Sequence, residues 1–567
     1  MFGPNLKYIP MNKFSMLMGA LFLLISLSSK AQFKVLATGP SFEELEKGTA
    51  KIILLKNGYT VYLQSEKREN YRIKTYNQDH KQIVTKNLLT PKLGPLSGCE
   101  LEAAFEVNGQ VALFVSGFQN KAPILYRIIF KPEDGSVVSE TELGRLEKLR
   151  PGNGLAMVFG GVTIPNFWVV KDDYSDNYAI AFVNSFESNR DQRVTVFHYN
   201  NKHEEISKAF MSSPESKFKY IDIVHFCVMG EKEVVVVLNA FNTASSGGKE
   251  SSTLIASFSN NNQNVTYNEI DMPEGYTLSS AIMRYNPITK KINLASLYTL
   301  SRKLLKSLDV DQGDIEACMR IHEIDPSTKI AKEGAPVKGG AANEKYMELF
   351  ARKNIFGKKS NFYGLFQNMY VNADGGISIL FEGYEFTSNT SISTNHTYNN
   401  TYLADIFVMN FDRNGNSKSS VLIPKHHRLE TTLLSGGGNY SANQYTRAIS
   451  GSPIGAGNQY KYFAYIPGKT NNYILLNDIE ENEQKVRKGK RTTIQGIGEC
   501  DDFSFVANSS DPMPARKYIF GEPAKREHQI ALLGISDYDP ISNTYVTLKL
   551  EIDGRDKKVR LVWLQPE

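Results

Sequence analysis

Short apolar segments alternate with polar turns along most of this chain. Runs such as Gln110–Ser116, Glu233–Leu238 and Tyr545–Leu550 are rich in β-branched and aromatic residues, and Gly, Asn, Asp, Pro or Ser bound them. Residues of these types pack well on a pleated surface, and such boundaries are typical of tight turns. The pattern therefore predicts an all-β protein.

One combination recurs at a nearly regular spacing. A strand that ends in an aromatic or aliphatic residue precedes a polar turn and a second, more polar strand, as in Tyr126–Phe130 before Lys131–Gly135. Successive copies lie 54 to 87 residues apart, and a copy at Tyr473–Leu476 fills a single gap of 141 residues. The other anchors are Tyr76, Phe130, Tyr199, Phe258, Ile324, Phe411 and Ile552.

These units predict a β-propeller. The first unit reads as four strands, at Lys51–Leu55, Tyr59–Gln64, Tyr71–Tyr76 and Gln82–Lys86. A lone four-stranded unit would expose apolar faces and open edges, whereas a closed ring of such units buries the faces and shortens the edges. We predict one propeller domain over residues 32–567, with about seven or eight four-stranded blades and short helical insertions. A row of β-sandwiches is the alternative architecture.

Closure of the ring requires the first and last blades to meet. The alternating run Lys558–Leu564 is predicted to pair beside Tyr545–Ile552, which places the two ends of the domain close together. Between blades, the Asn-, Ser- and Thr-rich stretch Tyr384–Tyr402 is predicted to lengthen one hairpin. Short helices are predicted at Leu300–Leu308, at Asn343–Lys353 and after a capping box at Ser41–Glu44.

The first 31 residues have the three parts of a secretory signal. Met11–Lys13 is a short basic start, Met16–Leu27 is apolar, and Ser29 and Ala31 are the small residues that a signal peptidase reads. The alternative is a membrane anchor, but the apolar run is shorter than the ~20 residues that span a bilayer. We predict cleavage before Gln32 and an exported protein, periplasmic or extracellular.

Net charge, apolar runs and cysteine content limit the classes of partner and the disulfide pairings that the sequence supports. The formal net charge is +5, and the predicted signal holds three lysines and no acid, so the mature chain is nearly neutral. This gives no reason to propose nucleic acid as a partner. No later apolar run reaches membrane-spanning length, so no transmembrane segment is predicted in the mature chain. The four cysteines form no C-x-x-C pair, and they allow either three disulfide pairings or buried thiols: Cys99, Cys227, Cys318 and Cys500.

Two stretches could hold a metal ion. Asp309, Asp311 and Asp314, with Gly313, have the alternating carboxylates and glycine of a calcium loop, but Arg320 stands where a bidentate Glu is expected. Calcium is therefore the one cofactor candidate, against a solvated acidic turn. His225 and Cys227 share one face of a predicted strand, which is half a metal site or ordinary core packing.

No catalytic residue can be assigned. The chain has no G-x-S-x-G, H-E-x-x-H or P-loop motif. Paired carboxylates of a glycosidase type are defined by their separation in space, which the sequence does not provide. The basic run Lys485–Arg491 could grip an anion, but Glu480, Glu481 and Glu483 precede it, so a solvated loop is the favoured interpretation.

Three stretches resemble uncharacterised secreted, propeller-like proteins of Bacteroidetes: Gly375–Glu382, Asp405–Gly415 closed by Ile423–Lys425, and Tyr473–Asp478. The resemblance covers about Gly375 to Asp478 and implies an exported propeller with no assigned activity. Its polar positions, and hence the candidate binding residues, are Glu382, Lys425, Asn477 and Asp478. The alternative is that these residues cap turns and pair across blades.

Together these features favour an exported binding or scaffolding propeller of the cell envelope. Its ligand would be an unknown envelope protein or glycan, and an enzyme is the less favoured class. The alternative function is a carbohydrate-active enzyme, a glycosidase or lyase, with paired carboxylates at the mouth of the propeller channel.

Overall fold

The computed structural model describes residues 33–43, 48–65, 70–96, 98–148, 150, 163–242, 251–259, 262–270, 276–300, 319–351, 359, 361–362, 364–391, 396–429, 460–525, 527–553 and 556–567. The predicted signal, the helix predicted after Leu300, the calcium candidates Asp309, Asp311 and Asp314, and Cys318 lie outside the described residues.

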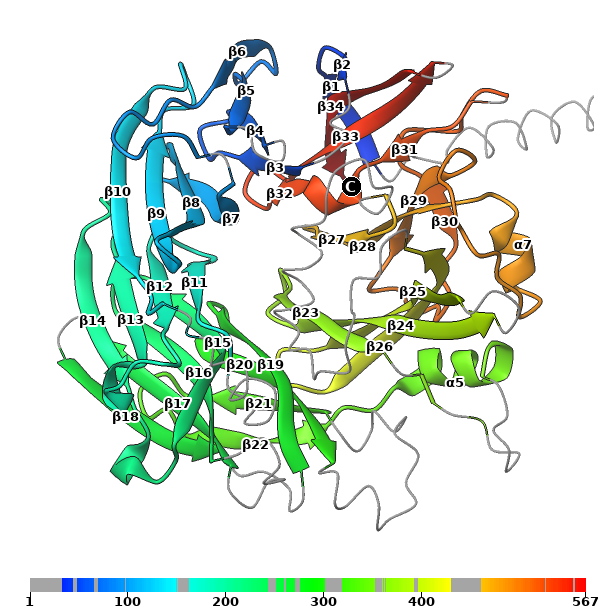
Figure 1. Cartoon of the computed structure of the whole chain (residues 1–567). Coiled ribbons are helices and arrows are strands. Elements are labelled where there is room, and N and C mark those ends of the chain that lie inside the picture. Colours follow the sequence, from blue (N-terminus) through cyan, green and yellow to red (C-terminus); the bar gives the residue numbers. More distant parts are fainter. Residues whose placement is uncertain are drawn as a thin grey trace, which may run out of the picture.

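Eight antiparallel sheets follow one another along the chain and close into a ring (Figure 1). The protein is therefore an eight-bladed β-propeller, as the repeat predicted. Blades 1 to 4 each take four consecutive strands: β3 (Thr49–Leu54), β4 (Thr60–Ser65), β5 (Arg72–Tyr76) and β6 (Gln82–Asn87); β7 (Glu100–Val107), β8 (Gln110–Gln119), β9 (Ala122–Phe130) and β10 (Val137–Arg145); β11 (Asn166–Lys171), β12 (Tyr178–Val183), β13 (Val194–Tyr199) and β14 (Glu205–Met211); β15 (Tyr220–Met229), β16 (Glu233–Phe241), β17 (Ser251–Ser259) and β18 (Asn262–Ile270).

Blades 5 to 7 continue the series in the same order. Their strands are β19 (Tyr276–Asn286), β20 (Lys291–Leu300), β21 (Met319–Ile324) and β22 (Ala331–Pro336); β23 (Leu365–Val371), β24 (Ile377–Ser391), β25 (His396–Phe411) and β26 (Ser417–Arg428); β27 (Phe463–Pro467), β28 (Asn472–Asp478), β29 (Asp501–Val506) and β30 (Arg516–Tyr518).

Both ends of the chain build blade 8. Its C-terminal strands are β31 (Ile530–Ala531), β32 (Asp537–Asp539), β33 (Thr544–Asp553) and β34 (Asp556–Pro566). The N-terminal strand β1 (Phe33–Thr38) pairs antiparallel with β34, from Phe33 opposite Pro566 onward, and β2 (Phe42–Glu43) pairs with the same strand. The predicted pairing of the last two strands and the proximity of the ends of the domain are confirmed.

The position of a strand within its blade determines its burial. The second strand β28 is buried at all seven residues, whereas the outer strand β6 is almost wholly exposed. A central strand has a neighbouring blade against each face and so reads as a continuous apolar run. The first strands are innermost, and β11, β15 and β19 contact one another in sequence around the ring axis.

Polar contacts join each blade to the next near the inner strands. Asp172 of blade 3 accepts the Gly230 amide of blade 4 at 2.9 Å, and Asn286 of blade 5 donates to the Gly375 carbonyl of blade 6 at 2.8 Å. At the seam that closes the ring, Trp563 of blade 8 donates to Thr60 of blade 1 at 2.9 Å. These contacts set the rotation of each blade, which apolar packing alone leaves less specific.

Three local expectations changed. The helix predicted at Asn343–Lys353 is present as α5, but it begins and ends a few residues earlier, at Gly340–Leu349. A second helix, α7 (Asn482–Val486), was not predicted. The short 3-10 helices are η1 (Arg190–Gln192), η2 (Pro214–Ser216) and η3 (Leu533–Ile535). The helix predicted from Ser41 is wrong at Phe42–Glu43, because pairing with β34 outweighs the local capping signal. The anchors Tyr473–Leu476 and Ile552 lie on the second strands of their blades, whereas the other anchors lie on third strands. Second and third strands have the same buried apolar pattern, so the sequence did not distinguish them.

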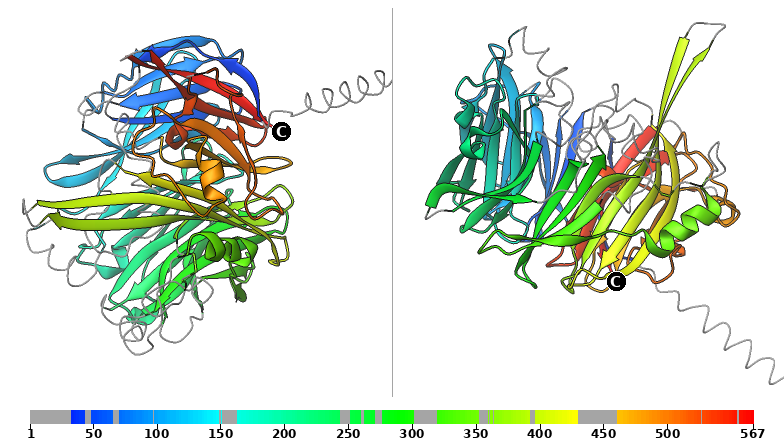
Figure 2. Two further views of the ribbon diagram at one scale, coloured as in Figure 1. Left: turned by 90° about the vertical axis from the view of Figure 1, so that its right-hand side faces the viewer. Right: turned by 90° about the horizontal axis from the view of Figure 1, so that it is seen from below.

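The hairpin of blade 6 projects from the ring. Strands β24 and β25 pair continuously out to Ser391 and His396, and the ribbon extends beyond the body in both side views (Figure 2). This confirms the predicted lengthening. We name residues 384–402 the arm. Among the described residues, none of the helices combines the length and apolar character needed to cross a membrane.

Candidate functional site

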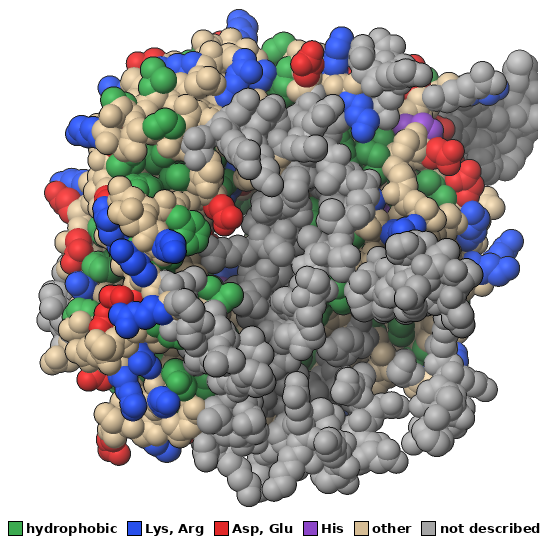
Figure 3. Space-filling model, in the orientation of Figure 1, with side chains coloured by type: hydrophobic (Ala, Val, Ile, Leu, Met, Phe, Trp, Pro, Cys, Tyr) green, Lys and Arg blue, Asp and Glu red, His purple; other side chains and the backbone are tan. Residues whose placement is uncertain are grey.

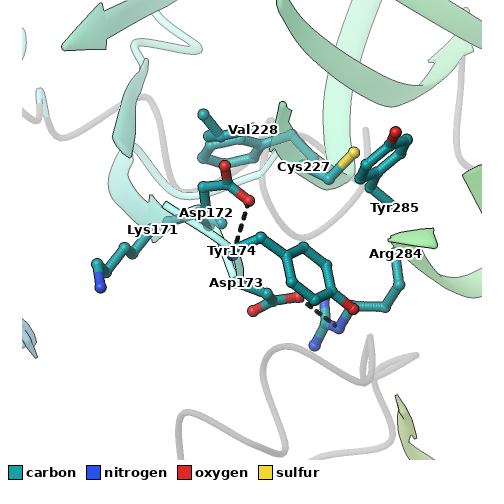
Figure 4. Close-up of a pocket in the computed structure, with 10 residues that line it drawn as sticks. Lys171, Asp172, Asp173, Tyr174, Cys227, Val228, Arg284 and Tyr285 are labelled. Atoms are coloured by element: carbon teal, nitrogen blue, oxygen red, sulfur yellow. Dashed lines mark hydrogen bonds and ion pairs between the residues drawn. The ribbon is translucent and has the colours of Figure 1, made fainter. Parts of the chain in front are cut away.

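A pocket lies where the inner strands of blades 3, 4 and 5 end (Figure 4). This end of the ring carries the β23–β24 turn, so it is opposite the face from which the arm projects. The cavity is about 20 Å³, room for about one water molecule. Its lining comes from the three blades: Val170, Lys171, Asp172, Asp173, Tyr174, Phe226, Cys227, Val228, Arg284 and Tyr285.

Arg284 connects four blades at this pocket. From β19 its guanidinium approaches Asp173 of blade 3 at 3.6 Å, His225 of blade 4 at 3.3 Å and Asn368 of blade 6 at 3.0 Å. The side chain is 23% exposed and Asp173 is 56% exposed, so the ion pair faces water. An exposed pair at this distance is weak, so an incoming anionic or hydrogen-bond-accepting group can compete with Asp173 for Arg284.

The β11–β12 turn presents the aromatic wall. Asp172 fixes this turn because its carboxylate accepts from the Tyr174 amide at 3.1 Å and from the Ser175 hydroxyl at 2.6 Å. Tyr174 is 50% exposed, and its ring packs edge-on against Tyr285, with the ring centroids 6.4 Å apart. A flat group can therefore lie on Tyr174 beside Arg284.

Two further titratable groups lie in or next to the pocket wall, the Cys227 thiol and the His225 imidazole. Burial raises the pKa of Cys227, so the thiol stays protonated and is a poor nucleophile. Burial, together with Arg284, holds the pKa of His225 well below its usual range. A neutral imidazole in contact with a guanidinium favours core packing over the half metal site considered for these two residues. No group of three metal-ligating side chains occurs within the part of the chain that the structure describes.

Next to the pocket, Asp176 links three blades. Its carboxylate contacts Lys56 of blade 1 at 2.7 Å and Lys171 of its own blade at 3.1 Å, and it accepts the Asn108 amide of blade 2 at 3.1 Å. Burial opposes ionisation of Asp176, but the two lysines and the amide outweigh it and lower its pKa. Because its partners come from blades 1, 2 and 3, the Asp176 carboxylate connects these blades.

Glu382 and Lys425, two of the residues predicted from the resemblance, form a buried ion pair. Glu382 lies on β24 and Lys425 on β26, and the exposed fractions of their side chains are 1% and 0%. Burial lowers the pKa of Lys425, and the Glu382 carboxylate opposes this. The pair ties the two strands that flank β25, which fits the alternative interpretation of these residues.

A second, partly buried ion pair lies beside the first. Asp405 of β25 is paired with Arg491, and its carboxylate also accepts the Lys425 amide at 2.9 Å. Arg491 belongs to the basic run Lys485–Arg491, so at least one of those charges is used internally. We name Glu382, Asp405, Lys425 and Arg491 the arm-root cluster, because all four lie at the base of the arm.

Asn477 and Asp478, the other two predicted residues, lie at the end of β28. Asn477 is fully buried; it donates to the Ala531 carbonyl at 2.7 Å and accepts the Ala531 amide at 3.1 Å, which joins blade 7 to blade 8. Asp478 accepts from Asn482 at 2.6 Å and contacts Arg516 at 3.3 Å. These contacts fit the alternative interpretation, pairing across blades and capping. The four residues thus form two separate pairs, one in blade 6 and one in blade 7.

Sequence reasoning missed Asp502. This residue of β29 lies opposite Asn477 and is 1% exposed, and among the described residues no side chain donates a hydrogen bond to its carboxyl oxygens. Burial, with the neighbouring Asp501, raises its pKa well above the usual range, so we infer a neutral carboxylic acid. The signal was present in the sequence, because two consecutive aspartates open the run Asp501–Val506, in which Ser504 is the only other polar residue.

Three of the four cysteines are described, and all three are free thiols. Cys227 and Cys500 are buried and Cys99 is partly exposed. Buried thiols were one of the two interpretations of the sequence, and Cys227 and Cys500 fit it.

Comparison with known proteins identifies no family for this chain. No protein-family model matches the chain, and no curated protein does. Solved structures that are similar include a protein of unknown function from Bacteroides caccae, at 11% identity and a TM-score of 0.25 over 64% of this chain and 93% of that one. The β-propeller domain of the Trilobed protease from Pyrococcus furiosus matches at 8% identity and a TM-score of 0.31, over 67% and 97% of the two chains.

A prolyl endopeptidase also matches, at 9% identity and a TM-score of 0.36, over 93% of this chain and 55% of that one. At these identities the likeness concerns the propeller fold alone.

Proposed function

We propose that this chain is an exported binding or scaffolding propeller of the cell envelope, and that its ligand contacts the pocket formed by blades 3, 4 and 5. The observation that carries the proposal is the combination of Arg284, Tyr174 and Tyr285 at one end of the ring. A guanidinium supplies directed hydrogen bonds, and tyrosine supplies apolar area at low entropic cost. These are the residue types that dominate binding energy at interfaces.

The chemistry of the pocket favours binding over turnover. Asp172 is committed to its turn, Asp173 faces Arg284, and the Cys227 thiol stays protonated. A glycosidase needs two carboxyl groups about 5–10 Å apart that act as acid and as base or nucleophile. No observation among the described residues favours that alternative.

The small cavity limits what enters it. With room for about one water molecule, the pocket accepts the end of a side chain or one substituent of a glycan, while the rest of the ligand lies on the surface. We expect that end to carry a carboxylate or another acceptor for Arg284, with a flat face against Tyr174.

Pull-down of envelope proteins and glycans with the mature chain tests the proposal. Tyr174→Ala should weaken the recovered interaction at least about tenfold, since truncation of a central aromatic residue costs about 1.4 kcal/mol or more. Ile541→Ala is the matched control, because Ile541 is 71% exposed in the turn between β32 and β33 of blade 8. Recovery of no ligand, together with measured turnover of a substrate, would contradict the proposal.

A further inference from the structure

The arm carries an open strand edge away from the body of the propeller. Pairing of β23 with β24 ends at Glu382, and pairing of β26 with β25 ends at Tyr402. Beyond these points the arm is a ribbon of two strands, and over Phe386–Ser391 the outer edge of β24 pairs with no described strand. This edge is a row of backbone donors and acceptors about 20 Å long.

Beyond Glu385, the composition of the arm leaves this edge unprotected. Native proteins blunt open edges with charged side chains, proline or bulges. From Phe386 to Ala404 the chain has no Asp, Glu, Lys, Arg or Pro. By contrast, the outer strand β6 of blade 1 carries Lys86.

The arm is nevertheless held firmly at its base. The arm-root cluster ties β24 to β26 through Glu382 and Lys425, and β25 to a loop of blade 7 through Asp405 and Arg491. In addition, the His426 imidazole stacks on Tyr402, with the ring centroids 4.8 Å apart. Buried ion pairs add little net stability but fix geometry when one partner cannot move without the other.

An isolated two-stranded ribbon is marginally stable in water, whereas three or more strands are stable. A second copy of the same arm supplies the missing strands. Two β24 edges paired antiparallel about a two-fold axis give a four-stranded sheet in the order β25–β24–β24–β25, and this contact is closed by symmetry. The absence of charge from Phe386 to Ala404 means that identical edges meet without like-charge repulsion.

The β24 edge fits this role better than the β25 edge. Strand β26 pairs with β25 as far as Tyr402, which lies opposite Arg428. One residue further along the arm, the Leu429 amide donates to the Thr401 carbonyl at 2.8 Å. The β24 edge has no such described contact from Phe386 onward. We propose that the arm is a self-association surface, through which two copies of this chain pair β24 to β24 on the face opposite the pocket.

Sedimentation analysis of the chain from Gln32 onward, which contains every described residue, tests this proposal. We expect a twofold increase in mass as the concentration rises to about 200 µM, since a six-residue contact is smaller than a standard ~1,600 Å² interface and associates more weakly. The variant Thr387→Lys with Asn389→Lys should remain monomeric over the same range, because pairing would bring the two added lysines of each copy together on one small sheet.

The matched control carries the same added charge on another outer strand. Gln82→Lys with Thr85→Lys places two lysines on exposed positions of β6 and should dimerise like the parent chain. The thermal midpoint of each variant shows that it is folded. A parent chain that stays monomeric to 200 µM, an arm variant that dimerises like the parent, or a β6 variant that loses the dimer equally would each overturn the proposal.

Discussion

The Glu382–Lys425 pair offers a direct test of whether the residues shared with the resembling proteins act in folding. Both side chains are almost wholly buried, so removing one charge leaves the other without its main partner in a low-dielectric site. Lys425→Met alone, or Glu382→Leu alone, should therefore lower the free energy of unfolding by about 3–5 kcal/mol. The double variant replaces both charges with apolar side chains and should lie within ~2 kcal/mol of the parent chain.

The expected thermal shift is small because the domain is large. Unfolding entropy is about 2.1 cal/mol/K per residue, so the roughly 430 described residues give about 0.9 kcal/mol/K. Each single variant should then lower the midpoint by only about 3–5 °C, and the double variant should recover most of this loss. Denaturant titration at constant temperature measures the same differences directly as changes in the free energy of unfolding.

An exposed ion pair provides the control. Lys345 and Glu348 form a pair at 2.8 Å on α5, with side chains that are 35% and 62% exposed. Lys345→Met should cost less than about 1 kcal/mol. The reasoning is refuted if the single variants at Glu382 and Lys425 are no less stable than this control, or if the double variant is as unstable as the singles. Ligand recovery by the stable double variant should equal that of the parent.

Three further predictions concern closure, pH and the leader. Truncation from Val559 removes five side chains of β34 that are at most 2% exposed, and their burial contributes about 10 kcal/mol, which is comparable to the whole stability of a domain. Calorimetry of the truncated chain should therefore find no cooperative unfolding. A transition like that of the full chain would contradict ring closure by β34. Burial raises the pKa of Asp478 from 3.8 to about 6, so between about pH 4 and 6 the folded chain holds a proton that the unfolded chain releases, and the free energy of unfolding falls as the pH rises through this range. In denaturant titrations, Asp478→Asn should flatten the dependence of the free energy of unfolding on pH by up to ~1.4 kcal/mol per pH unit. An unchanged pH dependence would argue against a raised pKa of Asp478. N-terminal sequencing of the protein from the producing cell should begin at Gln32, whereas retention of residues 11–31 would overturn the predicted cleavage.

Local patterns were sufficient for the blades. The four predicted strands of blade 1 differ from β3 to β6 by at most two residues at either end, because alternation and turn residues act within a few positions. Counting copies of the repeat predicted about eight blades for the same reason. The errors at Tyr473–Leu476 and Ile552 arose because second and third strands are both buried on two faces, and burial alone does not rank them.

Only the tertiary structure decided how the ring closes and where the polar groups lie. Phe33 pairs with Pro566 across almost the whole chain, and no local signal predicts a partner at that separation. Likewise, Arg284 contacts His225 and Asn368 through strands 59 and 84 residues away. A charged residue in a sequence is expected to be solvated unless a partner is known. Glu382 and Lys425 are buried together because β24 and β26 both pair with β25, and this arrangement is decided by the tertiary structure.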